Sequence, residues 1–168
     1  MLLRKGGIRE TGGKFRVEHE TVWLYPTYEH QQLELLKPNY MAQVQPVESG
    51  WHPSQVRIGS WAKITDSVQI MQADAIARLL PFHIWNMQFV TERLKWKPTQ
   101  PLQGLFLRVY TLPEPQIIPY IESYGSCKSW IDLQAAIALD EAYPVLGETE
   151  YQQQVNAIRG AADESVRT

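Results

Sequence analysis

Apolar and polar residues alternate along two long stretches of the chain, and this period of two is typical of half-buried β-strands. The clearer stretch is "LQGLFLRVYTL" at residues 102–112, where Leu105, Leu107 and Val109 share one face. The other is "VRIGSWAKITDSVQI" at residues 56–70, which is rich in β-branched and aromatic residues. Both stretches therefore predict strands that are longer than average.

The second stretch forms either one strand or two, because Gly59-Ser60 and Asp66-Ser67 are both possible breaks. Shorter strands are predicted at residues 2–3, 15–17 and 22–25. The glycines between residues 6 and 13 predict a hairpin loop between the first two of these.

Four segments space their apolar residues three or four apart, which predicts amphipathic helices. They are residues 28–37, 73–94, 129–143 and 148–161. Thr27 is a suitable N-cap for the first helix and Asp132 for the third, while Pro81 breaks the second.

Strands and helices do not alternate regularly along the chain. This order favours an α+β fold, with a small, largely antiparallel sheet or a partial barrel packed against helices. The 168 residues fit a single domain, 1–168. We expect its core over residues 1–145, and a C-terminal helix with a frayed acidic tail over 146–168. The start "MLLRKGG" resembles the tail of a strand, so we expect the natural N-terminus to lie further upstream.

Composition places the chain among globular proteins, since 44% of its residues are apolar and 20% are charged. No apolar run approaches the roughly 20 residues of a membrane span. The single cysteine, Cys127, cannot form an internal disulfide. We therefore expect a cytoplasmic protein without membrane attachment.

Known metal and cofactor motifs are not found in the sequence. "GIRETGGKF" lacks both the first glycine and the Ser or Thr of a phosphate-binding loop. The four histidines have no short ligand spacing, and one cysteine cannot build a thiolate site. No predicted strand carries the acid and lysine of a magnesium nuclease. We therefore expect neither a metal nor a cofactor.

Cations and aromatic rings interleave in "TERLKWKPTQPLQGLFLRVY", residues 91–110, and a second basic cluster follows the N-terminal leucines. Cations beside flat rings suit phosphates and stacked bases. Alternatively, these cations are ordinary solvent-exposed surface residues, and the tryptophan belongs to the core. The predicted phosphate contacts are Arg4, Lys5, Arg93, Lys95 and Arg108, with Trp96 or Tyr28 as the stacking ring.

The stretch "WLYPTYEHQ", residues 23–31, places several polar and aromatic side chains at the predicted start of the first helix. Free backbone N–H groups in a first helical turn favour an anion. We expect His30 and Gln31 to contact the edge of a base. The alternative is local and structural, with Thr27 as a cap and His30 bonded to a nearby carbonyl.

Several motifs occur together in a fixed order, and this ordered set is specific. They are "LLRKGGIRE", "GGKFRVEHE", "WLYPTYEHQ", "HIW", "RLKWKP", "LRVY" and "SCKSW". Together they resemble the domain of unknown function 1802 family, which is bacterial and well represented in cyanobacteria, from Leu2 to about Leu133. One departure is Ser126, where glycine is expected before the cysteine. The resemblance implies no established activity. It implies an association with restriction-endonuclease domains of the Mrr type, and hence a restriction or DNA-modification setting.

The residues thus favour a non-catalytic module that binds nucleic acid or a nucleotide-like ligand. Its partners would be DNA or RNA, and through the family a restriction-endonuclease-type protein. Whether the chain is an enzyme stays open.

Two alternatives come from other classes of protein. A hydrolase or transferase would need its catalytic side chains to meet in one pocket; the candidates are Glu29, His30, Cys127 and Lys128. An interaction scaffold would expose an apolar stripe on the C-terminal helices; the candidates are Ile137, Val155 and Ile158.

Overall fold

The structure is a computed structural model of the chain. It describes residues 1–5, 17, 19–28, 31–48, 50–96, 98–125, 130–137 and 141–163. The strand predicted at 15–17 and the glycine-rich hairpin loop before it lie almost wholly outside the described residues, as do His30 and Cys127.

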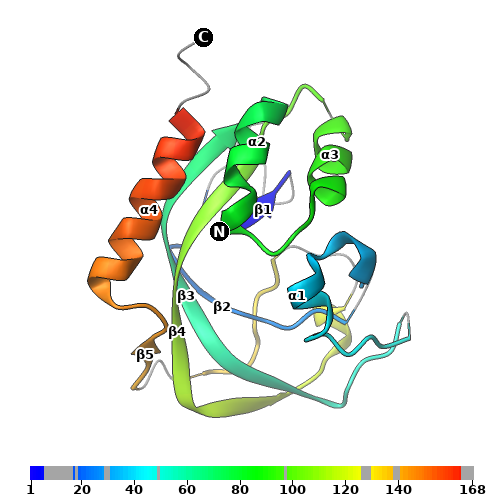
Figure 1. The fold of residues 1–168 in the computed structure, drawn as a ribbon. Helices are drawn as coiled ribbons and strands as arrows, with labels where there is room; N and C mark the ends of the chain where they lie inside the picture. The colour runs from blue at the N-terminus through cyan, green and yellow to red at the C-terminus, as the bar shows by residue number, and fades with distance from the viewer. Residues whose placement is uncertain are drawn as a thin grey trace.

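An open, antiparallel sheet of five strands organises the described part of the chain (Figure 1). Its order is β1-β4-β3-β2, and β5 pairs with β4 beside this path. The strands are β1 (Leu2–Arg4), β2 (Thr21–Trp23), β3 (Gln55–Ile70), β4 (Leu102–Pro119) and β5 (Tyr143–Pro144). The predicted α+β class is confirmed, and of the two predicted forms the open sheet is found.

The two long strands predicted from alternation, β3 and β4, form the central pair. Their pairing runs from Gln55 opposite Pro119 to Ile70 opposite Leu102. The helical segment between them, residues 71–101, therefore leaves the sheet after Ile70 and returns to it at Leu102, which is the pairing partner of Ile70. β3 is one continuous strand, so the two-strand alternative is wrong.

Two shifts of register interrupt the β3–β4 pairing, between residues 58 and 60 and between residues 64 and 66 of β3. They lie at or next to the predicted breaks. At the first shift, residues 112–115 of β4 stand opposite Gly59 alone. Pro113 and Pro115 lie there, and since proline has no N–H to donate, it is tolerated where the hydrogen-bond ladder is already broken.

Four α-helices are found in the described ranges, together with short 3-10 helices. They are α1 (Pro38–Met41), α2 (Ala73–Leu79), α3 (Met87–Lys95) and α4 (Glu148–Asp163), and the 3-10 helices span Leu33–Leu35, Leu80–Phe82 and Glu122–Tyr124. The predicted break at Pro81 is confirmed, because α2 and α3 flank it. Asn86 caps α3 by accepting a hydrogen bond from the Phe89 N–H at 3.1 Å.

Two predicted helices are not formed. In the segment 28–37, the described residues outside Leu33–Leu35 have no helical structure. In the segment 129–143, residues 130–137 form no helix, so the predicted helix N-cap at Asp132 is wrong. In the second case every other residue from Ile131 to Ile137 is apolar, which is the spacing of an extended chain, and tertiary packing selects that conformation.

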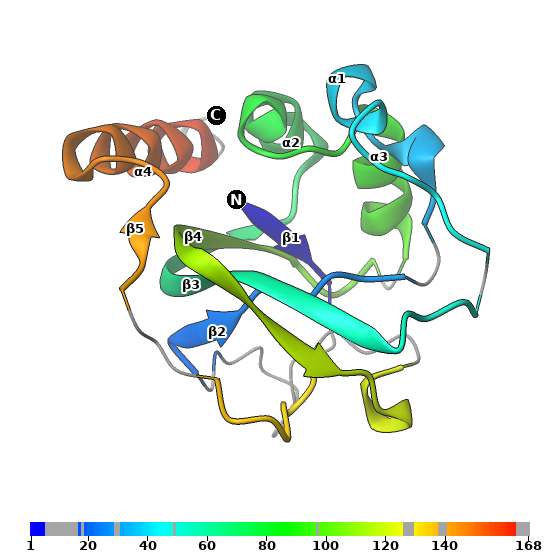
Figure 2. The same cartoon turned by 90° about the horizontal axis from the view of Figure 1, so that it is seen from below.

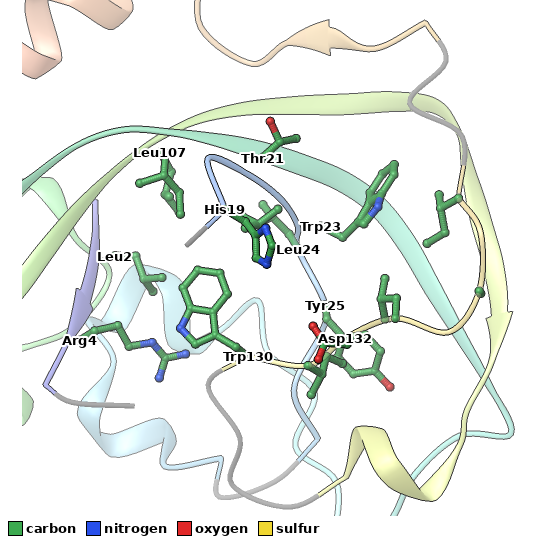
Figure 3. Close-up of a pocket in the computed structure, with 16 residues that line it drawn as sticks. Leu2, Arg4, His19, Thr21, Trp23, Leu24, Tyr25, Leu107, Trp130 and Asp132 are labelled. Carbon is green, nitrogen blue, oxygen red and sulfur yellow. The ribbon is translucent and has the colours of Figure 1, made fainter. Parts of the chain in front are cut away.

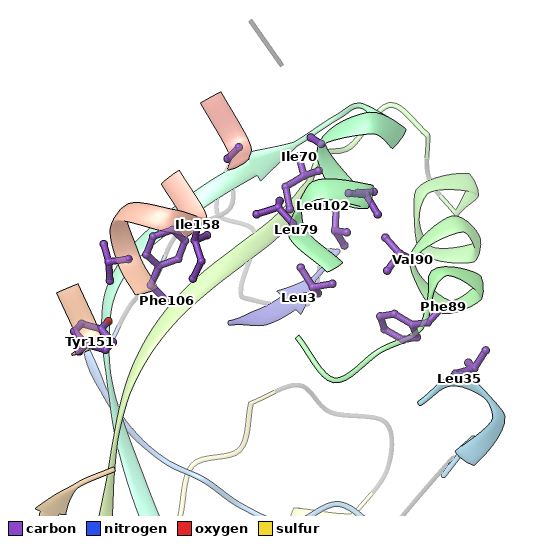
Figure 4. Packing of buried hydrophobic residues seen from close by; sticks show 14 residues of the cluster. Leu3, Leu35, Ile70, Leu79, Phe89, Val90, Leu102, Phe106, Tyr151 and Ile158 are labelled. Carbon is purple, nitrogen blue, oxygen red and sulfur yellow. The ribbon is translucent and has the colours of Figure 1, made fainter. Parts of the chain in front are cut away.

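The sheet separates two apolar layers, because successive side chains of a strand point to opposite faces. Helices α2, α3 and α4 cover one face, where the largest cluster includes Phe106, Leu79 and Val90 (Figures 2 and 4). The other face carries smaller clusters around Leu105 and Ile58. Residues 130–137 cover part of this second face in place of a helix.

Candidate functional site

A cavity of about 740 Å³ lies on the face of the sheet that the helices do not cover (Figure 3). Its walls come from β1, from β2 and the residues that follow it, from the middle of β3 and β4, and from residues 130–137. Apolar side chains such as Leu2, Ile64 and Leu107 form much of the lining. A volume of about 300–1,000 Å³ with a few polar groups among apolar ones is typical of small-molecule sites.

The segment 130–137 closes one side of this cavity. Ile131, Leu133, Ala135 and Ile137 all line the cavity and also pack against the apolar cluster that contains Ile58. The backbone N–H of Gln134 donates to the hydroxyl of Tyr124 at 2.7 Å. Apolar packing and this hydrogen bond hold the segment over the sheet.

Arg4 is the basic side chain that β1 supplies to the cavity. Because side chains alternate along β1, Leu2 and Arg4 face the cavity, whereas Leu3 and Lys5 face the helices. The Nε of Arg4 is buried and has no hydrogen-bond partner among the described residues. Burial, and after it the positive charge of Arg93, lower the pKa of Arg4. An anion at this position would relieve both effects.

The structure brings the two predicted basic clusters together where β1 meets the C-terminal end of α3. The Lys5 ammonium donates to the backbone carbonyl of Leu94 at 2.7 Å, and burial lowers its pKa. Arg93, one residue earlier, lies 5.2 Å from the ring of Phe89 and 5.9 Å from that of Trp96. Lys5 therefore joins strand to helix, and its side chain points away from the cavity.

Lys95 and Trp96 end α3 on the outside of the molecule, and both are exposed. Neither lines the cavity. They remain candidates for contacts outside it, beside Arg93.

Tyr25 lies across the cavity from Arg4 and follows β2 (Figure 3). Its ring packs edge-on against Tyr124 with a centroid distance of 5.7 Å. Burial, and then the neighbouring tyrosines 120, 28 and 124, raise its pKa to about 12, so the phenol keeps its proton at neutral pH. Its hydroxyl is buried and has no hydrogen-bond partner among the described residues.

Trp130 and Asp132 reach the cavity from the covering segment. In Figure 3 the guanidinium of Arg4 points toward the indole of Trp130, and Asp132 lies on the side of Tyr25. The indole Nε1 of Trp130 is a further buried donor without a partner in the described part of the chain. The exposed His19 also lines the cavity.

Arg108 does not belong to this site. It lies on the face that α4 covers, where its Nε donates to the Tyr110 hydroxyl at 2.9 Å and its guanidinium pairs with Glu148 at 2.7 Å. The guanidinium also lies 5.0 Å from the ring of Tyr151. Arg108 therefore does not reach this cavity, because its side chain points to the opposite face from that of Leu107, and its predicted phosphate contact stays a prediction for a different part of the surface.

Gln31 makes local hydrogen bonds and does not line the cavity. Its side-chain amide donates to the Thr27 carbonyl at 3.2 Å and accepts from the Val47 N–H at 3.0 Å. The expectation that His30 contacts a base lies outside the described residues, as do the catalytic candidates Glu29, Cys127 and Lys128.

Tyr28 belongs to an aromatic group beside the cavity. Its ring packs edge-on against Trp51 at 5.6 Å and His52 at 6.3 Å, and His52 stacks on Tyr120 at 4.5 Å. Tyr28 does not line the cavity, but it lies close enough to Tyr25 to raise the pKa of that phenol.

Sequence reasoning missed Tyr25, Trp130 and Asp132 as lining residues. Tyr25 was assigned to a buried strand, and the other two to a helix. The signal that was available is the alternation from Ile131 to Ile137, which predicts an extended segment with one apolar side.

Two further searches concern metals and membranes. Across the described ranges, no three His, Cys, Asp or Glu side chains converge in a way that could hold a metal ion. In the same part of the chain, no helix combines the length and the apolar character that crossing a membrane requires.

Helices on one face of an open antiparallel sheet, and a cationic and aromatic cavity on the other, define an α+β protein with a cavity of ligand size. The chain belongs to the DUF1802 family: residues 1–157 match the model described as domain of unknown function (DUF1802). No curated protein and no solved structure matches the chain.

Proposed function

We propose that this protein is a non-catalytic module that binds nucleic acid or a nucleotide-like ligand through the cavity beneath residues 130–137. The observation that carries the proposal is Arg4, a cation in the cavity wall whose buried Nε has no hydrogen-bond partner among the described residues, with a second cation, Arg93, nearby. An arginine with such an unsatisfied donor is suited to a phosphate or carboxylate.

The aromatic residues around the cavity support the same class of ligand. Trp23, Tyr25 and Trp130 line it, and planar bases pack favourably against such side chains. A restriction or DNA-modification setting, with a restriction-endonuclease-type partner, fits this ligand class and rests on the family association alone.

The scaffold alternative is disfavoured by burial. Val155 and Ile158 are only 5% and 6% exposed, because α4 packs them into the main core. Ile137 is half-buried in the cavity wall. The predicted exposed stripe on these three residues is therefore wrong.

Removing the positive charge of Arg4 should weaken binding strongly. We expect fluorescence anisotropy with labelled nucleotides and with single-stranded and duplex oligonucleotides to show salt-sensitive binding of at least one of these probes to the wild type, since phosphate contacts release counterions. Arg4→Met should weaken it at least about tenfold, because a charged hydrogen bond is lost. Arg159→Met is the matched control, since Arg159 pairs with Asp66 at the exposed end of α4. Equal loss in both variants, or no binding at low salt, contradicts the proposal.

Reversing two charges at the end of α3 tests the electrostatic part of the proposal. The double variant Arg93→Glu, Lys95→Glu places negative charge beside Arg4 and should lose binding, with the largest loss at low salt. Anisotropy at two salt concentrations measures this effect. Unchanged affinity would show that the field around Arg4 does not attract the ligand.

A further inference from the structure

We propose that the cavity binds a single nucleoside monophosphate, with the phosphate at Arg4 and Trp130 and the base toward Tyr25. This inference rests on the proposed function and narrows its ligand from any nucleic acid or nucleotide to one mononucleotide in one orientation. It follows from the cover that residues 130–137 give the cavity, from its buried donors that no described residue satisfies and from the position of Arg4.

Residues 130–137 cover part of the cavity and limit its length along the sheet. Proteins bind a polymer along a groove that makes repeated phosphate contacts. Here residues 130–137 lie over the cavity, and their apolar side chains and the Gln134–Tyr124 hydrogen bond hold them to the protein. The cavity of about 740 Å³ is large enough for one ring-bearing molecule of nucleotide size.

The buried groups of the cavity that lack a partner among the described residues are hydrogen-bond donors. Arg4 Nε and Trp130 Nε1 can only donate, and the protonated Tyr25 hydroxyl is a donor as well. Leaving a buried donor unpaired is unfavourable, so a ligand that supplies acceptors gains affinity here. Phosphate and base carbonyl oxygens, and ring nitrogens, are such acceptors.

The position of the cations fixes the orientation. Arg4 and Trp130 lie on one side of the cavity, and Tyr25 lies on the other (Figure 3). A phosphate is attracted to Arg4, with Arg93 as a second cation nearby. The phosphate therefore belongs at the arginine side.

The base then occupies the other side, where the lining is aromatic. Trp23 and Tyr25 line this part, and Tyr124 supports the Tyr25 ring edge-on from outside the lining. Aromatic walls favour a planar ring over a second sugar or phosphate. The Tyr25 hydroxyl can donate to a carbonyl oxygen or ring nitrogen at the edge of the base.

Isothermal titration calorimetry with purine and pyrimidine nucleoside 5′-monophosphates, the corresponding nucleosides, ribose 5-phosphate and a short oligodeoxynucleotide tests this inference. We expect at least one monophosphate to bind at least about tenfold more tightly than its nucleoside, because the nucleoside lacks the charged contact. Ribose 5-phosphate, which lacks the base, should also bind more weakly, and the oligodeoxynucleotide should not compete.

Two variants test the contact to the base and the contact to the phosphate separately. Tyr25→Phe removes only the hydroxyl and should weaken the monophosphate about threefold to tenfold while leaving ribose 5-phosphate unchanged. Trp130→Phe should weaken both, because it removes a donor at the phosphate. Tyr143→Phe is the matched control, since Tyr143 is 63% exposed on β5. Thermal melting verifies that each variant is folded.

The outcomes distinguish the inference from the proposed function. Oligonucleotides that bind through Arg4 while monophosphates do not would overturn the mononucleotide assignment and leave the proposed function standing. Monophosphate binding that Tyr25→Phe and Trp130→Phe leave unchanged would overturn the proposed orientation and place the ligand elsewhere. No binding of any probe would overturn both.

Discussion

Phe106→Ala is expected to lower the free energy of unfolding by about 3–5 kcal/mol, the usual cost of truncating a fully buried phenylalanine. Phe106 is 2% exposed and packs in the cluster between the sheet and helices α2 and α4 (Figure 4). The substitution removes the ring and leaves a cavity that strands and helices cannot readily fill. Urea denaturation monitored by circular dichroism measures the change.

Leu107→Ala is the matched control for this substitution, because Leu107 is the next residue of β4 and lines the existing cavity. Truncation there enlarges a space that is already present, so fewer packing contacts are lost and we expect a smaller loss of stability. An equal or larger loss for Leu107→Ala would contradict the assignment of the two faces of the sheet.

The second large effect is a loss of stability on acidification, centred on His83. This side chain is 5% exposed, and among the described residues its ring nitrogens make no hydrogen bond of good geometry, although the Trp85 backbone lies close enough to act on the ring. Burial, and then the positive charges of Lys37 and the amino terminus, lower its pKa to about 4, with a weaker opposing effect from the backbone of Trp85. Lys37 is fixed nearby by hydrogen bonds to the carbonyls of Leu80 and His83.

The sign of the effect follows from the two protonation states. In the unfolded chain a histidine binds its proton near pH 6.5, whereas folded His83 stays neutral until about pH 4. Stability is therefore complete above about pH 6.5 and falls as the pH drops toward 4, by about 3 kcal/mol in total. Urea denaturation at several pH values measures this slope.

His83→Gln and His83→Met remove the titrating group and should flatten the dependence between pH 6.5 and 4, even if each variant is less stable at neutral pH. The difference between wild type and variant isolates His83 from carboxylates that titrate in the same range. A wild-type slope that both variants retain would show that His83 is not its source.

The sequence correctly predicted the elements whose apolar pattern fits only one type of secondary structure. Alternation over residues 56–70 and 102–112 identified β3 and β4, and Pro81 divided α2 from α3. The segment 129–143 was mistaken because its apolar residues fit both a helix and an extended chain, and contacts with distant residues decide between them.

The candidate site was predictable only in part. Arg4 and Arg93 were predicted as phosphate contacts, but their proximity depends on β1 lying against α3, which no local pattern reports. Because side chains alternate along β4, Leu107 and Arg108 point to opposite faces of the sheet. The sequence does not show which face holds the cavity, so Arg108 was an equally reasonable candidate for a ligand contact. Tyr25 and Trp130 are far apart in sequence and meet only through the fold.

The helical segment between β3 and β4 is a place where the length of the chain can vary. Ile70 and Leu102 are paired neighbours, so residues 71–101 enter and leave the sheet at one point. Lengthening a segment whose two ends lie side by side adds only a small entropic cost of loop closure. The connection between α2 and α3 carries the buried His83, but Pro98 and Thr99, between α3 and β4, are exposed turn residues. Insertions at Pro98 and Thr99 should therefore leave the strand register intact. A small reporter domain inserted there should be tolerated without loss of stability, which thermal melting measures.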